Sequence, residues 1–353
     1  MALNNRMMYY CSMNIHSKTI VTFGEIMLRL RSPERELLFQ SPVLETVFGG
    51  SEANVAVSVA MLGGRAVYVT ALPSNAVGDA AVRSLRSYGV DVRAYRAEGR
   101  MGIYYLEGGA CQRPSQVIYD RDGSCFAVSG PDKYNWDALF TGTGWFHLSG
   151  VTPAVSQSAF DCGMAAVHAA KKNGVVISLD LNYRNKLWRY GKSASDVLRE
   201  FARSADVIIA NEEDIQKCLG ISLNERLHPD EAYRELCDKV KEQFPNVHMV
   251  AVTLRFSYSA DRNGWSAVLS GEKGYYQSRQ YDIENIVERV GAGDSFAAAL
   301  IYALTEWNDE QQSLEFAAAS SCLKHSIPGD FNLATKEQVL ALMNGNGTGR
   351  IQR

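Results

Sequence analysis

Short apolar runs that alternate with helical patterns limit how this chain can fold more than any other feature. Each run is rich in β-branched residues and too short for a helix, so it is expected to form a buried strand. Apolar strands separated by helices are typical of an α/β fold, in which a central, mostly parallel sheet has helices on both faces. The expected strands are 19–23, 66–71, 145–149, 175–180, 206–210 and 247–254. The expected helices are 51–62, 76–88, 156–172, 229–243, one that follows Asp294, 313–324 and 335–343.

Two segments, 25–48 and 96–127, depart from this alternation. Both have extended, alternating patterns with turn residues, which predict a small antiparallel sheet beside the main one. A β insertion of this kind serves as a lid or as a subunit contact, and the alternative is a plain extension of the main sheet's edge. We expect one domain over residues 19–343 with this discontinuous β lid, after a flexible leader over residues 1–18. Lid strands can pair between subunits, which would give a homo-oligomer.

The composition is that of a soluble globular protein of 353 residues, with 46% hydrophobic and 21% charged residues. A net charge of −3 provides no global basic field that would attract nucleic acid or an anionic membrane. No apolar run reaches the roughly 20 residues that a membrane span needs. The seven cysteines are scattered and lack CxxC spacing, which favours reduced thiols and a cytoplasmic location over disulfides or zinc.

The stretch Gly291-Ala292-Gly293-Asp294 precedes an Ala-rich helical pattern. Backbone N–H groups at such a helix start point outward and bind anions, including the spread negative charge of a phosphoryl group in transfer. Asp294 is then a candidate catalytic base for a substrate hydroxyl. An Asp after glycines is also a common helix cap, so the motif alone supports the structural and the functional interpretation about equally.

A second motif, Gly49-Gly50-Ser51-Glu52-Ala53-Asn54, lies near the N-terminus. The structural interpretation is a tight turn before a capped helix. The functional interpretation is a sugar pocket, in which Gly50 allows a ligand to approach and Asn54 bonds its hydroxyls.

These two motifs, in this order on this strand–helix background, resemble the ribokinase-like or PfkB family of carbohydrate kinases. The resemblance extends from about residue 20 to 343. It implies a ribokinase-like sheet with a β lid, ATP as phosphoryl donor, Asp294 as base and the Gly291, Ala292 and Gly293 amides as an anion hole. No GxxxxGK[ST] motif is present, so the ATP site is not of the Walker type.

Within this family the likeness is strongest to the 2-keto-3-deoxygluconate kinases. It is carried by the stretches 24–30, 102–105, 113–115, 119–121, 180–184, 187–188 and 323–330. It implies a substrate site that includes Tyr104, Tyr119, Arg121, Arg184 and Asp330. The residue chemistry agrees, because a guanidinium fork matches the geometry of a carboxylate.

The resemblance also implies a nucleotide site along the ends of later strands. Asn182 and Arg184 would lie between the two ligands, and Asn211, Thr253 and Arg255 would contact the nucleotide. Asp214, where relatives have Glu, would hold Mg²⁺ indirectly through water. A helix start explains Asn211 and the acidic turn after it equally well.

The expected reaction is therefore transfer of the γ-phosphoryl group of MgATP to the C6 hydroxyl of 2-keto-3-deoxygluconate. One alternative is another sugar kinase, such as a fructokinase, a ribokinase or a keto-deoxygalactonate kinase. The other is a non-catalytic sugar-acid sensor, which the intact Asp294 disfavours.

Overall fold

The computed structural model describes residues 19–307 and 309–345, and the predicted leader over residues 1–18 lies outside this range. Its largest sheet has ten strands in the order β13-β12-β11-β10-β9-β8-β1-β4-β5, with β14 paired to β12. The strands from β11 to β5 in this order are parallel, and β12 turns back antiparallel to β11. Their bounds are β1 Thr19–Phe23, β4 Arg65–Pro73, β5 Asp91–Ala97, β8 Thr143–Ser149, β9 Val176–Asp180, β10 Val207–Ala210, β11 Met249–Ser257, β12 Arg262–Ser270, β13 Tyr275–Gln277 and β14 Tyr281–Glu284.

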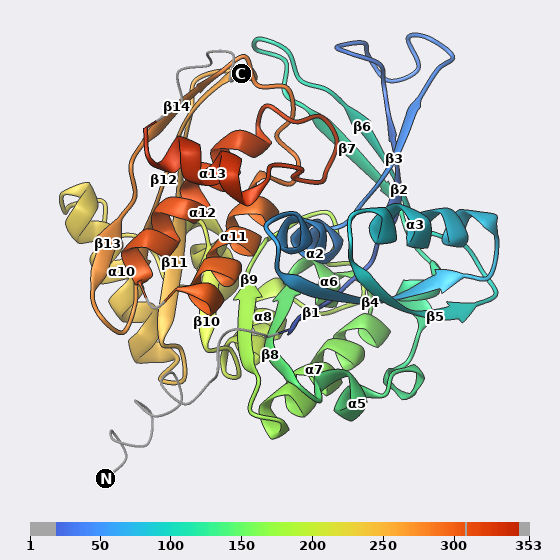
Figure 1. The fold of residues 1–353 in the computed structure, drawn as a ribbon, viewed down its shortest axis with the longest axis horizontal. Coiled ribbons are helices and arrows are strands. Elements are labelled where there is room, and N and C mark those ends of the chain that lie inside the picture. Colours follow the sequence, from blue (N-terminus) through green and yellow to red (C-terminus); the bar gives the residue numbers. More distant parts are fainter. Residues whose placement is uncertain (1–18, 308, 346–353) are drawn as a thin grey trace.

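Helices cover both faces of this sheet (Figure 1), and each face has its own apolar core. The predicted α/β fold with helices on both faces is thus confirmed. On one face are α2 Ser51–Met61, α3 Ala76–Ser87, α11 Ala292–Glu306, α12 Glu310–Lys324 and α13 Lys336–Met343. On the other are α4 Cys125–Val128, α5 Trp136–Phe140, α6 Val151–Val155, α7 Gln157–Lys172, α8 Ala194–Ala202, α9 Glu212–Leu219 and α10 Pro229–Gln243, with a 3₁₀ turn at Pro131–Lys133.

A separate four-stranded sheet, the lid, stands beside the main one (Figure 1). Its strands, in the order β3-β2-β6-β7, are β2 Met27–Arg31, β3 Glu45–Gly49, β6 Ile103–Glu107 and β7 Gln116–Asp120. The prediction of an antiparallel lid was wrong at its centre, where β2 and β6 pair in parallel. They do so because β2 follows β1 and β6 follows β5, two strands that leave the main sheet in the same direction.

The ends of the second predicted lid segment also belong elsewhere. Residues 96 and 97 complete β5, and residues 125–127 form most of α4, whose start is capped by the Ser124 side chain. No helix in the described part of the chain combines the length and the apolar composition of a membrane crossing.

Candidate active site

A cleft of about 530 Å³ lies between the lid and the carboxyl ends of the parallel strands. In an open α/β sheet this edge is where ligands bind. The cleft brings together the predicted site residues Gly50, Asn54, Tyr104, Tyr119, Arg121, Asn182, Arg184, Asn211, Asp214, Thr253, Arg255, Gly291, Gly293, Asp294 and Asp330.

Asp294 lies in the first turn of α11, and only 9% of its surface is exposed. Its side chain does not cap the helix. Instead, one carboxylate oxygen accepts a hydrogen bond from Ser51 Oγ and the other from Asn54 Nδ2, each at 2.7 Å. Burial raises the pKa of Asp294, and these two hydrogen bonds oppose the shift. The two motifs that lie 240 residues apart in sequence therefore form one site.

Asn54 and Gly50 line the cleft and also make contacts within the chain. Asn54 Nδ2 donates to Asp294, and the Asn54 amide oxygen accepts from the Gly50 N–H at 3.3 Å. A Cβ on Gly50 would lie 2.1 Å from the carbonyl oxygen of Glu25. The close approach that Gly50 allows is thus to the chain's own backbone.

The glycine turn before α11 has one position that only glycine fits and one position with open space beside it. Gly291 has φ +82°, in the left-handed region that favours glycine, and a Cβ there would lie 2.1 Å from the carbonyl oxygen of Asp330. A Cβ on Gly293 would meet no atom within 4 Å. Ala292, which was also predicted to contribute an amide, does not line the cleft, and its N–H donates to the Arg289 carbonyl at 3.4 Å. The first-turn amides of Gly293 and Asp294 lack helical acceptors by geometry.

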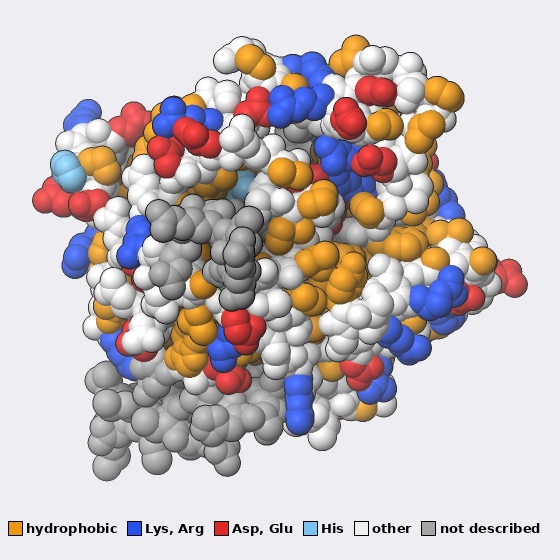
Figure 2. All heavy atoms as spheres, turned by 45° about the horizontal axis from the view of Figure 1, so that its top comes forward, with side chains coloured by type: hydrophobic (Ala, Val, Ile, Leu, Met, Phe, Trp, Pro, Cys, Tyr) orange, Lys and Arg blue, Asp and Glu red, His pale blue; other side chains and the backbone are white. Residues whose placement is uncertain are grey.

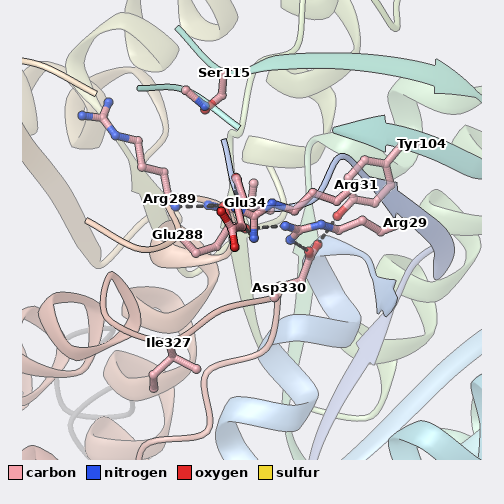
Figure 3. A network of polar contacts seen from close by, with 12 residues as sticks. Arg29, Arg31, Glu34, Tyr104, Ser115, Glu288, Arg289, Ile327 and Asp330 are labelled. Carbon is pink, nitrogen blue, oxygen red and sulfur yellow. Dashed lines mark hydrogen bonds and ion pairs between the residues drawn. The ribbon is translucent and has the colours of Figure 1, made fainter. Parts of the chain in front are cut away.

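A buried ionic network joins the lid to the C-terminal part of the chain (Figure 3). Arg29 on β2 donates to Asp330 Oδ1 at 2.5 Å and also binds Glu288. The hydroxyl of Tyr104 on β6 donates to Asp330 Oδ2 at 2.5 Å. Both carboxylate oxygens of Asp330 are therefore engaged by the lid itself.

Arg121 is buried at the lid side of the cleft and already has a carboxylate partner. Its Nε donates to Glu25 Oε2 at 2.7 Å, and Ser124 Oγ donates to the other Glu25 oxygen at 2.5 Å. Its guanidinium also lies 5.7 Å from the centre of the Tyr119 ring. Nη1 is buried without a partner in the part of the chain that the structure describes. The pair is thus neutral overall and keeps one unsatisfied donor in a residue that lines the cleft.

Two further guanidinium groups, those of Arg184 and Arg255, line the cleft on its other side. Arg184 is exposed, and its one hydrogen bond within the described residues is to the Tyr183 carbonyl at 3.0 Å. Arg255 follows Thr253 on β11 and lies over the Trp265 ring, 5.3 Å from its centre.

Acidic and amide groups follow β9 and β10 at the cleft. Asn211 caps α9 by accepting from the Asp214 N–H, and its Nδ2 donates to Asp214 Oδ2 at 3.0 Å. The structural interpretation of Asn211 therefore holds, whether or not it also contacts a ligand. Asn182 donates to the hydroxyls of Ser51 and Ser149 at 3.3 and 3.1 Å.

Carboxylates are crowded where β9 and β10 end. Burial raises the pKa of Asp180 well above its usual value, and the charges of Asp294 and Asp214 raise it further. Burial raises the pKa of Asp214 to about 6. The described residues contain no ready-made group of three metal ligands. The crowded carboxylate oxygens nevertheless fit a hydrated Mg²⁺, which prefers few protein oxygens and relieves such repulsion.

Sequence reasoning missed several residues of the cleft. Ser51 and Asp180 had usable signals, since Ser51 follows the paired glycines and Asp180 ends a buried strand. The network partners Arg29 and Glu288 had none, because they meet across 259 residues. Arg289 also lines the cleft and is fixed by Ser259, Ala260 and Asn263.

On the face shown in Figure 2, Lys and Arg side chains are interspersed with Asp and Glu side chains, without a large area of one sign.

Comparisons with a family model, with related sequences and with solved structures all identify the same family. Residues 17–333 match the family described as pfkB family carbohydrate kinase. A 2-dehydro-3-deoxygalactonokinase of Haloferax volcanii is 30% identical over 94% of this chain and 98% of its own. The crystal structure of a 2-dehydro-3-deoxygluconokinase from Thermotoga maritima superposes with a TM-score of 0.89, at 44% identity, over 94% of this chain and 99% of that one. The chain therefore belongs to the pfkB family of carbohydrate kinases, ATP-dependent phosphotransferases with the ribokinase-like fold.

Proposed function

We propose that this kinase transfers the γ-phosphoryl group of ATP to the C6 hydroxyl of 2-keto-3-deoxygluconate. The observation that carries the proposal is a buried carboxylate, Asp294, in a cleft that is also lined by the guanidinium groups of Arg121, Arg184 and Arg255. Asp294 takes the hydroxyl proton while the oxygen attacks the γ-phosphorus and ADP leaves. Ser51 and Asn54 aim the carboxylate before the substrate arrives.

The cleft supports an acidic sugar on its lid side. Nη1 of Arg121 is an unsatisfied buried donor, and leaving such a group unpaired is costly. A substrate carboxylate would satisfy it, and Arg184 is free to add a second charge-assisted bond. Tyr104 and Tyr119, which face each other across β6 and β7, give the sugar an apolar wall.

The opposite side of the cleft supports the nucleotide. Arg255 and Thr253 would contact the phosphates, and the first-turn amides of α11 would bind the transferred group. Asp180 and Asp214, with Asn211 beside them, would hold the water shell of Mg²⁺. Bound Mg²⁺ supplies charge neutralisation at the phosphate oxygens.

The names of the relatives support a keto-deoxy sugar acid as the substrate class, but they differ in its epimer. The Haloferax volcanii relative is named for the galacto form of the keto-deoxy acid, and the more similar Thermotoga maritima structure for the gluco form. A kinase for the galacto epimer is therefore the main alternative. Fructokinases are also among the relatives, at about a quarter identity.

A coupled assay of ADP release tests the proposal directly. The substrates are both keto-deoxy acids, fructose and ribose, each titrated at saturating MgATP. We expect the highest kcat/KM for the gluco acid, with the product phosphate on C6 by NMR. A higher kcat/KM for fructose or ribose would contradict the assignment to a sugar acid, and a preference for the galacto acid would contradict only the epimer.

We also propose a cytoplasmic homo-oligomer that forms through the lid. The cysteines in the described ranges are free, in keeping with a reducing compartment. The lid segments expose large apolar side chains, which favour burial against a second copy. These are Leu37, Phe39, Val43, Val47 and Ile118.

A further inference from the structure

Lys324, the last residue of α12, has a fully buried side chain. Lysine almost always keeps its ammonium group in water unless the group is paired. Here Nζ donates to two backbone carbonyls, Ile327 O at 2.9 Å and Gly329 O at 2.8 Å. Within the described residues no carboxylate lies close enough to form an ion pair with it. Lys324 is thus a buried cation held by backbone dipoles.

The loop that Lys324 holds leads directly into the site. Gly329 has φ +83°, and Asp330 follows it with its side chain facing Arg29 (Figure 3). The Asp330 carbonyl packs against Gly291, and Lys324 Cε lies 3.3 Å from where a Gly291 Cβ would be. The lysine therefore fixes the loop that lies directly behind the glycine turn of α11.

The surroundings of Lys324 contain charges of both signs. Burial lowers its pKa to about 8, whereas Glu288, Asp330 and Asp294 favour its charged form and Arg29 opposes it. A buried charge is costly, and replacing it with an apolar residue of similar size often leaves the stability of the fold unchanged or increases it. Its presence beside the glycine turn points to a use for the charge.

We propose that Lys324 is a positioning residue whose ammonium orders the 327–330 loop and provides a fixed positive charge behind the anion-binding turn at Gly291–Gly293. The transferred phosphoryl group gathers negative charge on the other side of that turn, in a site of low dielectric where a fixed charge acts strongly. The inference rests on phosphoryl transfer at Asp294, but not on which sugar accepts the group.

The test compares Lys324→Met, which removes the charge, with Lys324→Arg, which keeps it. Lys241→Met is the matched control, because Lys241 Nζ also donates to a hydroxyl and a carbonyl, Ser270 Oγ and Gly271 O at 3.0 Å, yet lines no part of the cleft. For Lys324→Met we expect kcat to fall about 100-fold, with both KM values within about threefold of wild type. Lys324→Arg should retain clearly more activity, and the control should retain all of it.

The unmodified enzyme provides a second readout that needs no variant to fold. Its kcat/KM should fall as the pH rises through about 8, as Lys324 loses its proton. The absence of this decline would contradict the proposal. A kcat equal to that of wild type in folded Lys324→Met would also contradict the proposal. So would equal losses of kcat in Lys324→Met and Lys324→Arg, because they would show that Lys324 contributes packing and not charge. All rates are measured on the best substrate of the sugar panel, so a wrong substrate assignment appears in the wild type and a wrong role for Lys324 in the variants.

Discussion

The arginines of the cleft differ in how much freedom they have. Arg121 is buried against Glu25 and keeps a single free donor. Arg184 is exposed and bonds only a neighbouring carbonyl among the described residues. Among the described residues Arg184 has no carboxylate partner, so its guanidinium can turn toward a ligand, and we expect it to distinguish acidic from neutral sugars.

Substitution of Arg184 by Ala should lower kcat/KM for the keto-deoxy acid by about 10- to 100-fold, the effect of losing a hydrogen bond to a charged group. Turnover of a neutral sugar should change far less. Arg189→Ala, an exposed arginine on the same loop that does not line the cleft, is the control. Equal losses on acidic and neutral sugars would show that Arg184 acts on the nucleotide instead.

Glu52 illustrates a residue whose ionisation opposes folding. It is buried at the start of α2, and burial raises its pKa to about 7, although Thr152 and the Ser149 N–H donate to it. Because the folded-state pKa is above that of the unfolded chain, its ionisation lowers stability as the pH rises from about 4.5 to 7.

We therefore expect Glu52→Gln to gain stability relative to wild type at pH 8 but not at pH 4.5. The gain should be about 3 kcal/mol, because the wild-type carboxylate must ionise in a buried site whereas the amide stays neutral. Urea unfolding of both proteins at the two pH values measures it. A difference that does not depend on pH would show that Glu52 has an ordinary pKa.

At the scale of residues, the hydrogen-bond partner of each side chain was the property least predictable from the sequence. Asp294 and Asn54 were both predicted as site residues, but the hydrogen bond between them was not predicted. A sequence pattern reports which residue types are near a turn, whereas a contact across 240 residues depends on how the elements pack.

At the scale of elements, the turn before α11 provides two glycines with opposite constraints. Gly291 has a positive φ and is crowded by Asp330, whereas the space beside Gly293 is open to the cleft. The fold thus requires glycine at position 291, whereas the space beside Gly293 is available to a ligand in the cleft.

Substitution of Gly293 by Ala should leave the thermal unfolding midpoint nearly unchanged but lower kcat, because the methyl group enters the space of the phosphoryl group. Gly291→Ala should lower the free energy of unfolding by more than about 1 kcal/mol, since Ala is strained at positive φ. Calorimetry and the coupled assay separate the two effects. Full activity in Gly293→Ala would remove the turn from the phosphate site.

The strands and helices that were predicted lie within two or three residues of observed elements, because their apolar period is a local property of the chain. The strands β12 to β14 and the helices α4, α5, α6, α8 and α9 had no predicted counterpart. The first strand, β1, and the helix α10 match the predicted bounds. The pairing of β2 with β6 was not predictable in this way. Alternating side chains identify a strand, but its direction against a distant partner depends on the strands that precede both.

At the scale of the whole molecule, the site depends on contacts between the N-terminal and C-terminal parts of the chain. Arg29 of the lid binds Glu288 and Asp330 of the C-terminal part, and Ser51 and Asn54 of the N-terminal part bind Asp294. The family resemblance predicted which residues share the cleft, since the family has one fold. It did not predict the ion pairs of Arg29 with Glu288 and Asp330, which depend on how the lid packs against the C-terminal part.

The central claim is that Asp294 takes the proton of the substrate hydroxyl, and Asp294→Asn tests it most directly. The amide can still accept from Asn54 and donate to Ser51, so the site should stay ordered. Burial raises the pKa of Asp294 above that of the unfolded chain, so its charge costs stability at neutral pH. The variant should therefore unfold at a higher temperature, bind ATP and sugar nearly as wild type by calorimetry, and lose about 10²- to 10⁴-fold in kcat. A folded variant whose kcat stays within a few-fold of wild type would contradict the account.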